Sequence, residues 1–190
     1  MTFSRAPLAV AFALTLAGCS GPLLGADVTE PKLCLMLQAV TIPAAPAIPT
    51  GVTVPDQTVT WTGDLDVGSS IPGLDKAGAV TGAIHMLSLT TAASPATTDL
   101  SSITSASVAV TDATGNALSF MHYTRPTPVT TPSELDMVLD DDLNLLDELQ
   151  GGVLHYTITF AGLPPTTAWT ADIETCFSAH LTIDALKALQ

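Results

Sequence analysis

The sequence predicts a mainly β protein, an antiparallel β-sandwich with one inserted amphipathic α-helix. Two segments near the C-terminus, residues 153–160 and 169–184, alternate between apolar and polar side chains with a period of two. This pattern is typical of half-buried antiparallel strands. Residues 132–150 instead repeat leucine at intervals of three and four, as an amphipathic helix does. Seven or so strands with one helix favour the sandwich architecture.

The clearest strand signal covers residues 169–184. Trp169 and Phe177 belong to its apolar set, whereas Cys176 falls on its polar face. So long a period-two pattern predicts a half-buried strand that is bent midway. The preceding alternating segment is expected to form a second strand, joined to it by a glycine- and proline-containing turn.

The β signal also extends over much of the earlier chain. The expected strands there are residues 58–62, 80–89, 107–111 and 118–123. Residues 112–116 are predicted as a hairpin loop, because glycine and asparagine tolerate the positive φ angles of such turns. The apolar run over residues 33–37 is consistent with a buried strand or a short helix. Four prolines make residues 43–55 an extended stretch that cannot lie centrally in a sheet.

The predicted helix has start and stop signals of its own. Thr131 and Glu134 match a capping box, with Pro132 at the first helical position. Its apolar stripe consists of Leu135, Leu139, Leu143, Leu146 and Leu149. Gly151 and Gly152 supply the stop. We expect this helix to pack on the sheets of a β-sandwich of the immunoglobulin-like or a related type.

The N-terminal segment has the features of an exported chain. Residues 1–7 carry one positive charge, Arg5, and residues 8–16 form an apolar run that is too short to span a bilayer. The run closes on Leu16-Ala17-Gly18-Cys19. This motif resembles the lipobox of bacterial lipoproteins. The alternative is an ordinary secretory signal peptide with a coincidental cysteine.

The resemblance implies a cleaved signal peptide over residues 1–18 and a lipid anchor on Cys19, formed by diacylglycerol and acyl chains such as palmitate. Residues 19–31 are then the acylated N-terminus and a flexible tether, and residues 32–190 form a single β-sandwich domain. The protein is expected at the cell envelope, held to the membrane by its acyl chains. Ser20 stands where some lipoproteins carry the aspartate that retains them in the inner membrane, so the outer membrane is favoured if the source is Gram-negative.

The acidic balance of the chain limits its partners. The 190 residues include 5 Lys and Arg against 18 Asp and Glu, for a formal net charge of −13. Cleavage after residue 18 removes Arg5 and no acid, which brings the charge of the remaining 172 residues to −14. Such a surface repels nucleic acid and anionic lipid headgroups. The expected partners are therefore the membrane, through the acyl chains, and an unidentified protein or ligand.

Two cysteines, Cys34 and Cys176, remain once Cys19 is assigned to lipid. In an exported protein such a pair more often forms a disulfide than stays reduced. Because Cys176 falls on the polar face of its strand, the bridge is expected to lie across a sheet surface or at a bulge. The alternative is two unpaired thiols.

Two residue patterns invite a metal-binding interpretation, and neither is strong. Asp140, Asp142 and Asn144 match the first ligands of an EF-hand loop, but Leu145 and Gly151 replace the required glycine and glutamate. Each histidine falls in a different predicted strand, and none has the sequence spacing typical of metal ligands. The four histidines are His85, His122, His155 and His180. No metal or cofactor is expected.

Recognised catalytic motifs are absent from the sequence. The acidic pair Asp64 and Asp66 is a weak candidate for glycoside hydrolysis. Trp61 and Trp169 fall on the apolar faces of their strands, which favours core packing over sugar stacking. A catalytic site would have to be assembled by the fold.

The best candidate for such assembly is a pair of histidines, His155 and His180. They are expected on the polar faces of adjacent strands, with Asp172 or Glu174 nearby. The sequence therefore favours a non-catalytic binding or structural module at the cell envelope. The alternatives are an envelope carrier of a small apolar ligand or lipid, and a hydrolase with an unrecognised site.

Overall fold

The computed structural model describes residues 25–47, 56–71, 74, 80–111, 116–140, 142–150 and 152–184. This part of the chain forms nine strands and one short 3-10 helix. The elements in order are β1 (Gly25–Ile42), β2 (Gln57–Asp66), β3 (Val80–Ala93), β4 (Ile103–Thr111), β5 (Ala117–Thr124), β6 (Glu134–Leu139), η1 (Leu146–Glu148), β7 (Leu149–Gln150), β8 (Val153–Gly162) and β9 (Trp169–Asp184). The mainly β class predicted from the sequence is confirmed.

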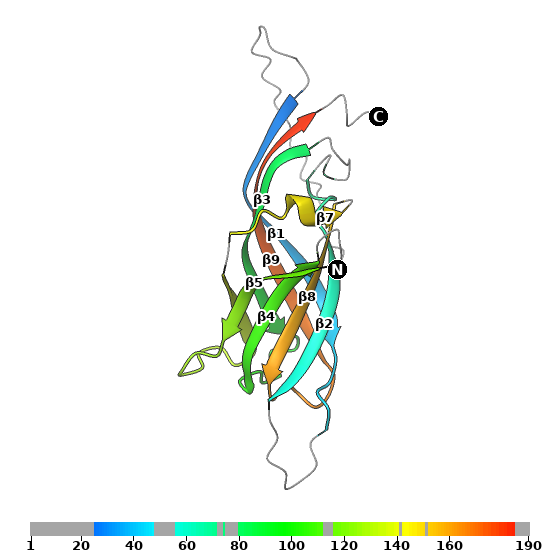
Figure 1. Ribbon diagram of the computed structural model, residues 1–190. Coiled ribbons are helices and arrows are strands. Elements are labelled where there is room, and N and C mark those ends of the chain that lie inside the picture. The colour runs from blue at the N-terminus through cyan, green and yellow to red at the C-terminus, as the bar shows by residue number, and fades with distance from the viewer. Residues whose placement is uncertain are drawn as a thin grey trace, which may run out of the picture.

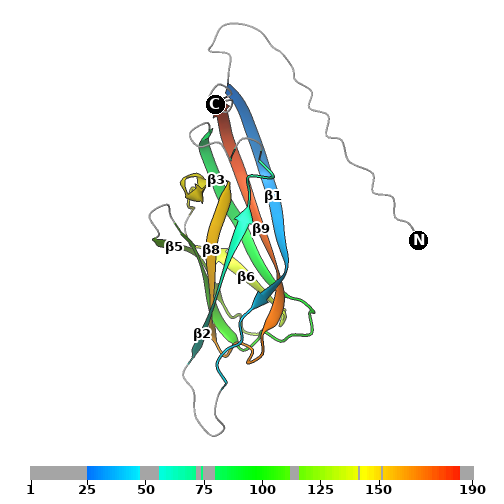
Figure 2. The same ribbon diagram turned by 90° about the vertical axis from the view of Figure 1, so that its right-hand side faces the viewer.

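The strands join into one curled antiparallel sheet in the order β1-β9-β3-β6-β5-β4-β8-β2, with β7 paired to β8. Figures 1 and 2 show the half that contains β1, β9 and β3 facing the half that contains β4, β8 and β2. The two halves are continuous through β6, which pairs with β3 on one side and with β5 on the other.

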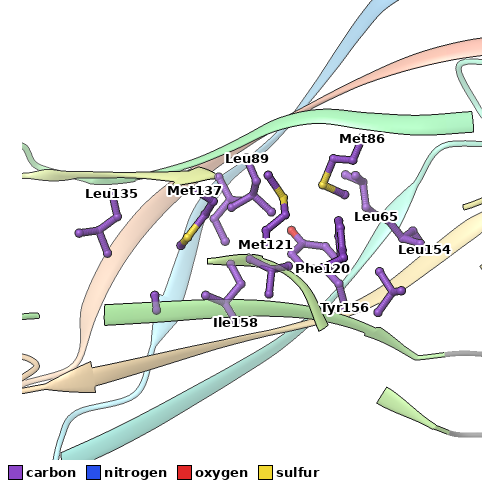
Figure 3. Close-up of a cluster of buried hydrophobic side chains, with 14 of the residues drawn as sticks. Leu65, Met86, Leu89, Phe120, Met121, Leu135, Met137, Leu154, Tyr156 and Ile158 are labelled. Atoms are coloured by element: carbon purple, nitrogen blue, oxygen red, sulfur yellow. The ribbon is translucent and has the colours of Figure 1, made fainter. Parts of the chain in front are cut away.

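The core lies between these halves and is built by the period-two pattern. The apolar set of β9 is buried along most of the strand, including Trp169, Ile173 and Phe177. Tyr156, Ile158 and other alternate residues of β8 meet this set from the opposite half. Figure 3 shows part of the resulting cluster, with leucine, methionine and aromatic side chains filling the space between the ribbons. Burial of this apolar surface is the main stabilising term of the fold.

The predicted helix over residues 132–150 is wrong. The described residues of this segment form β6, an irregular stretch, η1 and β7. Within β6 the inward side chains are Leu135 and Met137, which alternate with the outward residues Glu134 and Asp136. This segment therefore carries a period-two pattern, typical of a strand, as well as the leucine stripe of a helix. Pairing with both β3 and β5 stabilises the strand over the helix.

A short segment that we call the strap, residues 140 and 142–145, then crosses from β6 to the other end of β3. The N–H of Leu145 donates to the carbonyl of Ile84 at 2.7 Å, and the side-chain carbonyl of Asn144 accepts the N–H of Ile84 at 3.0 Å. Leu145 is fully buried, although the helical stripe does not include it.

We expect Leu145→Ala to lower the free energy of unfolding by about 2–5 kcal/mol, the usual range for a leucine truncated in a core. Leu143→Ala should have a smaller effect, because Leu143 is only partly buried against the core. Chemical denaturation of both variants measures the difference. A larger effect at Leu143 than at Leu145 would favour the helix over the strap.

Strand β1 begins inside the segment for which the sequence predicted a tether, because residues 25–31 are already paired with β9 or continue the strand. The apolar run 33–37 belongs to the same strand rather than to a helix, and its side chains are partly exposed rather than fully buried. The described residues contain no helix with the length and apolar character needed to cross a membrane.

Candidate functional site

The cysteine pair lies where two neighbouring strands meet. Cys34 of β1 and Cys176 of β9 are directly opposite each other in the antiparallel register and form a disulfide, with a Cα–Cα distance of 4.0 Å. The bridge therefore crosses a sheet surface, as the position of Cys176 on the polar face predicted. Cys19, the predicted lipidation site, lies outside the described residues.

Among the residues described, one group of side chains is close enough together to hold a metal ion, and two of its three members are the disulfide cysteines. Glu174 lies beside the bridge, with its Oε1 atom 3.7 Å from the Cys176 Sγ, and the ligand atoms of Cys34, Glu174 and Cys176 fall within 4.8 Å of one another. The two sulfur atoms are bonded to each other, so neither offers the thiolate that a metal requires.

The acidic segment considered for calcium has different partners for each of its candidate ligands. The carboxylate of Asp140 contacts His122, and that of Asp142 lies 2.7 Å from the Nδ1 of His85. The amide of Asn144 hydrogen bonds to the backbone of β3. These groups fasten the strap to the sheet instead of turning toward a common cation.

The histidines expected on adjacent strands are separated by the topology. His155 lies on β8, which pairs with β2 and β4, whereas His180 lies on β9, which pairs with β1 and β3. The Nδ1 of His155 is 2.6 Å from the Asp64 carboxylate, and the Nδ1 of His180 is 3.0 Å from the Thr29 hydroxyl. The prediction that the two histidines share a surface is therefore wrong, because the strands that follow each other in sequence belong to opposite halves of the sheet.

The remaining acidic candidates have structural partners. The Asp172 carboxylate accepts the N–H of Ala39 at 2.8 Å, at a bulge of β1 where Ala39 adopts a φ of 53°. The Asp66 carboxylate accepts the N–H of Ser69 at 2.9 Å and stabilises the turn after β2. Asp64 and Asp66 therefore have separate roles rather than forming a pair that flanks one bond.

Both tryptophans pack against core aromatic rings. Trp169 is buried and meets Phe160 edge-on at a centroid distance of 5.9 Å. Trp61 is half-buried and meets Tyr156 at 5.5 Å. Its ring also covers Gly63, where an added Cβ would lie 2.1 Å from the ring. Both contacts agree with the prediction that the two tryptophans pack against the core.

A surface pocket lies where the curled sheet divides. Strands β5 and β6 pair only at Met121 with Leu139 and at His122 with Val138. Beyond that point β5 continues alongside β4, and β6 continues alongside β3. The two strands diverge, and residues 125–133 connect the end of β5 to the start of β6.

The pocket formed by this divergence has a volume of about 210 Å³. Tyr123 lines it from β5, Pro126 from the connecting loop, and Glu134, Asp136 and Val138 from β6. Tyr123 is 7% exposed. Burial raises the pKa of its phenol above the usual value, the Arg125 charge opposes this shift, and the Asp136 charge adds to it. The phenol is thus a neutral hydroxyl group at ordinary pH.

Sequence reasoning missed this pocket, since its residues form no motif and come from elements on either side of a loop. The acidic residues Glu134 and Asp136 lay within the segment that the sequence predicted as a helix, so they gave no signal of a pocket. No protein-family model, curated protein or solved structure matches this chain.

Proposed function

We propose that this protein is a lipid-anchored component of the cell envelope that acts as a non-catalytic binding or structural module. Cys19 is the acylated residue, and the acyl chains hold the protein to the membrane, the outer membrane if the source is Gram-negative. The domain that follows is proposed to work as a β-sandwich whose two facing layers are the halves of the curled sheet.

The observation that carries this proposal is the motif Leu16-Ala17-Gly18-Cys19 after an apolar run, and the chain from its cysteine to the first strand is short. Strand β1 begins at Gly25, six residues after Cys19. Six residues span at most about 20 Å. An anchor at Cys19 therefore places the end of β1 close to the membrane surface, and the paired strands β1 and β9 connect that end to the rest of the domain.

The packing between the two halves favours a module over a carrier of an apolar ligand. A carrier needs an enclosed apolar cavity, commonly about 300–1,000 Å³ for a drug-sized ligand. The space between the halves is instead occupied by large, fully buried side chains, among them Phe120, Tyr156, Phe160 and Phe177. Figure 3 labels Phe120 and Tyr156 among the side chains that lie in this interior space.

Hydrolysis receives less support, because the residues considered for it are dispersed. His155 contacts Asp64 on the surface of the half that contains β2 and β8, whereas Glu174 lies beside the disulfide in the other half. A general base has to be within hydrogen-bond reach of the group it activates. The described positions of these residues do not bring them to one site.

The Cys19→Ala variant of the full-length protein tests the anchor. We expect wild-type protein to partition into the detergent phase and Cys19→Ala to appear in the aqueous phase or as uncleaved precursor, since the variant lacks the sulfur that receives the lipid. Ser20→Ala, which changes the next residue and leaves the sulfur in place, is the matched control and should partition like the wild type. Equal detergent partitioning of all three proteins would exclude acylation at Cys19.

A further inference from the structure

The outer face of β1 and β9 carries three potential metal ligands, two of which are joined by the disulfide. The Sγ atoms of Cys34 and Cys176 and a carboxylate oxygen of Glu174 all lie within 4.8 Å of one another. In a tetrahedral zinc site the sulfur and oxygen ligands are roughly 3.5–4 Å apart. The three side chains therefore need only small movements to hold one zinc ion once the bond between the sulfurs is open.

The strands keep these side chains on one face whether or not the bridge is closed. Cys34 lies directly opposite Cys176 in the pairing of β1 with β9. Glu174 precedes Cys176 by two residues on β9, so the period of the strand directs both to the same side. In the described part of the chain no lysine or arginine forms an ion pair with Glu174. Its carboxylate is therefore available to a cation.

The disulfide is open to attack from the solvent at one of its two sulfurs. Cys34 is exposed, whereas Cys176 is only 3% exposed. Figure 2 shows β1 beside β9, on the side away from β3. Register shifts interrupt the pairing of β1 with β9 on both sides of Cys34, within residues 30–33 and 37–40. Exposed disulfides are the labile ones among those of exported proteins, so this bridge is well placed for reduction by an external thiol.

The donor set selects the ion. Two thiolates exclude Ca²⁺ and Mg²⁺, which take oxygen ligands. Zn²⁺ accepts both cysteine sulfur and carboxylate oxygen, whereas a carboxylate oxygen is a poor ligand for the softer Cu⁺. Three protein ligands also leave a fourth position for water, because Cys34 and Glu174 are exposed.

We propose that Cys34 and Cys176 form a redox-controlled zinc site, with Glu174 as the third protein ligand. With the bridge closed, the pair fixes β1 to β9 and offers no thiolate. With the bridge open, both sulfurs bind Zn²⁺ as thiolates, and the ion takes over the link between the two strands.

The reductant of this step is a dithiol. One of its thiolates attacks the exposed Cys34 Sγ, the bond to Cys176 breaks, and the electron pair of that bond leaves on the Cys176 sulfur. The second thiol of the reductant then attacks the reductant's own sulfur in the mixed disulfide, which releases Cys34 and leaves a cyclic disulfide. Two electrons and two protons thus pass from the dithiol to the cysteine pair. Binding of Zn²⁺ releases the two thiol protons to the solvent.

The test is a zinc titration of the full-length chain carrying Cys19→Ala, in which Cys34 and Cys176 are the only cysteines. The protein is reduced with dithiothreitol and separated from it without oxygen, and binding is measured by competition with a chromophoric chelator. We expect one zinc ion per reduced chain and at least about a hundredfold weaker binding by the oxidised chain, because only the reduced chain offers thiolates. Equal affinity of the two forms would overturn the proposal.

Charge-matched variants test the third ligand. Glu174→Gln removes the carboxylate charge with little change of shape, and should lower the zinc affinity of the reduced chain by about tenfold or more. Glu30→Gln removes the same charge from an exposed position of β1 and is the matched control, which should bind zinc like the parent chain. Equal affinity of these two variants, with the circular dichroism unchanged, would contradict the assignment of Glu174.

Unfolding of the reduced chain separates the folded site from loose thiols. Zinc bound to the native arrangement should raise the denaturation midpoint of the reduced chain and leave that of the oxidised chain unchanged. A midpoint of the reduced chain that zinc lowered or did not change would show that the ion binds unfolded thiols, and would overturn the proposal. These measurements do not use the lipid, so their outcome is independent of the partitioning experiment on Cys19.

Discussion

Removal of the disulfide in the double variant Cys34→Ala/Cys176→Ala is expected to lower the free energy of unfolding by about 2–5 kcal/mol. The bridge joins residues 142 positions apart in sequence, so it restricts the unfolded chain over most of the domain. It also fixes β1, which lies at one end of the strand order and, within the described part of the chain, pairs only with β9. Loss of the bridge should therefore loosen β1 first.

Denaturant unfolding of the variant and of the wild type measures this effect, and hydrogen exchange at the amides of β1 and β9 locates it. Ser88→Ala is a matched control, because Ser88 pairs with Cys176 from the β3 side and does not take part in the bridge. A double cysteine variant as stable as the wild type, with unchanged exchange in β1, would show that the disulfide does not hold this edge of the sheet.

Truncation of the core in Phe160→Ala is expected to have an effect of similar size, about 3–5 kcal/mol. Phe160 is fully buried on β8 and meets Trp169 of β9 edge-on. These two strands belong to opposite halves of the curled sheet, so the aromatic pair joins the two halves directly. Its loss leaves a cavity at the contact between them.

Thermal and denaturant unfolding of Phe160→Ala should show a lower midpoint. The neighbouring outward residue provides the control, since Thr159 is only partly buried, and Thr159→Ala should change stability by less than about 1 kcal/mol. Similar small effects from both substitutions would mean that the two halves do not pack through this pair.

Much of the strand content was predictable because it depends on local alternation. The inward and outward positions of β9 follow the period-two pattern of its sequence, and the surface position of the disulfide followed from the parity of Cys176. The helix prediction failed where two periodicities compete. Leu135 and Met137 satisfy a strand, while the leucines spaced by three and four satisfy a helix. Only the pairing of β6 with β3 and β5 selects the strand.

The candidate sites were harder to predict because they depend on strand order. β8 and β9 are consecutive in sequence yet lie in different halves, which separates His155 from His180. The surface pocket arises where β5 continues alongside β4 while β6 continues alongside β3, and no local pattern encodes that divergence.

Intact-mass and N-terminal peptide mass spectrometry of the membrane-extracted protein tests the central claim most directly. The protein is predicted to begin at Cys19, with residues 1–18 removed and a diacylglycerol on the cysteine sulfur. An N-terminal peptide that contains an unmodified Cys19, or a mature chain that begins at another residue, would contradict the assignment of this protein as a lipid-anchored envelope module.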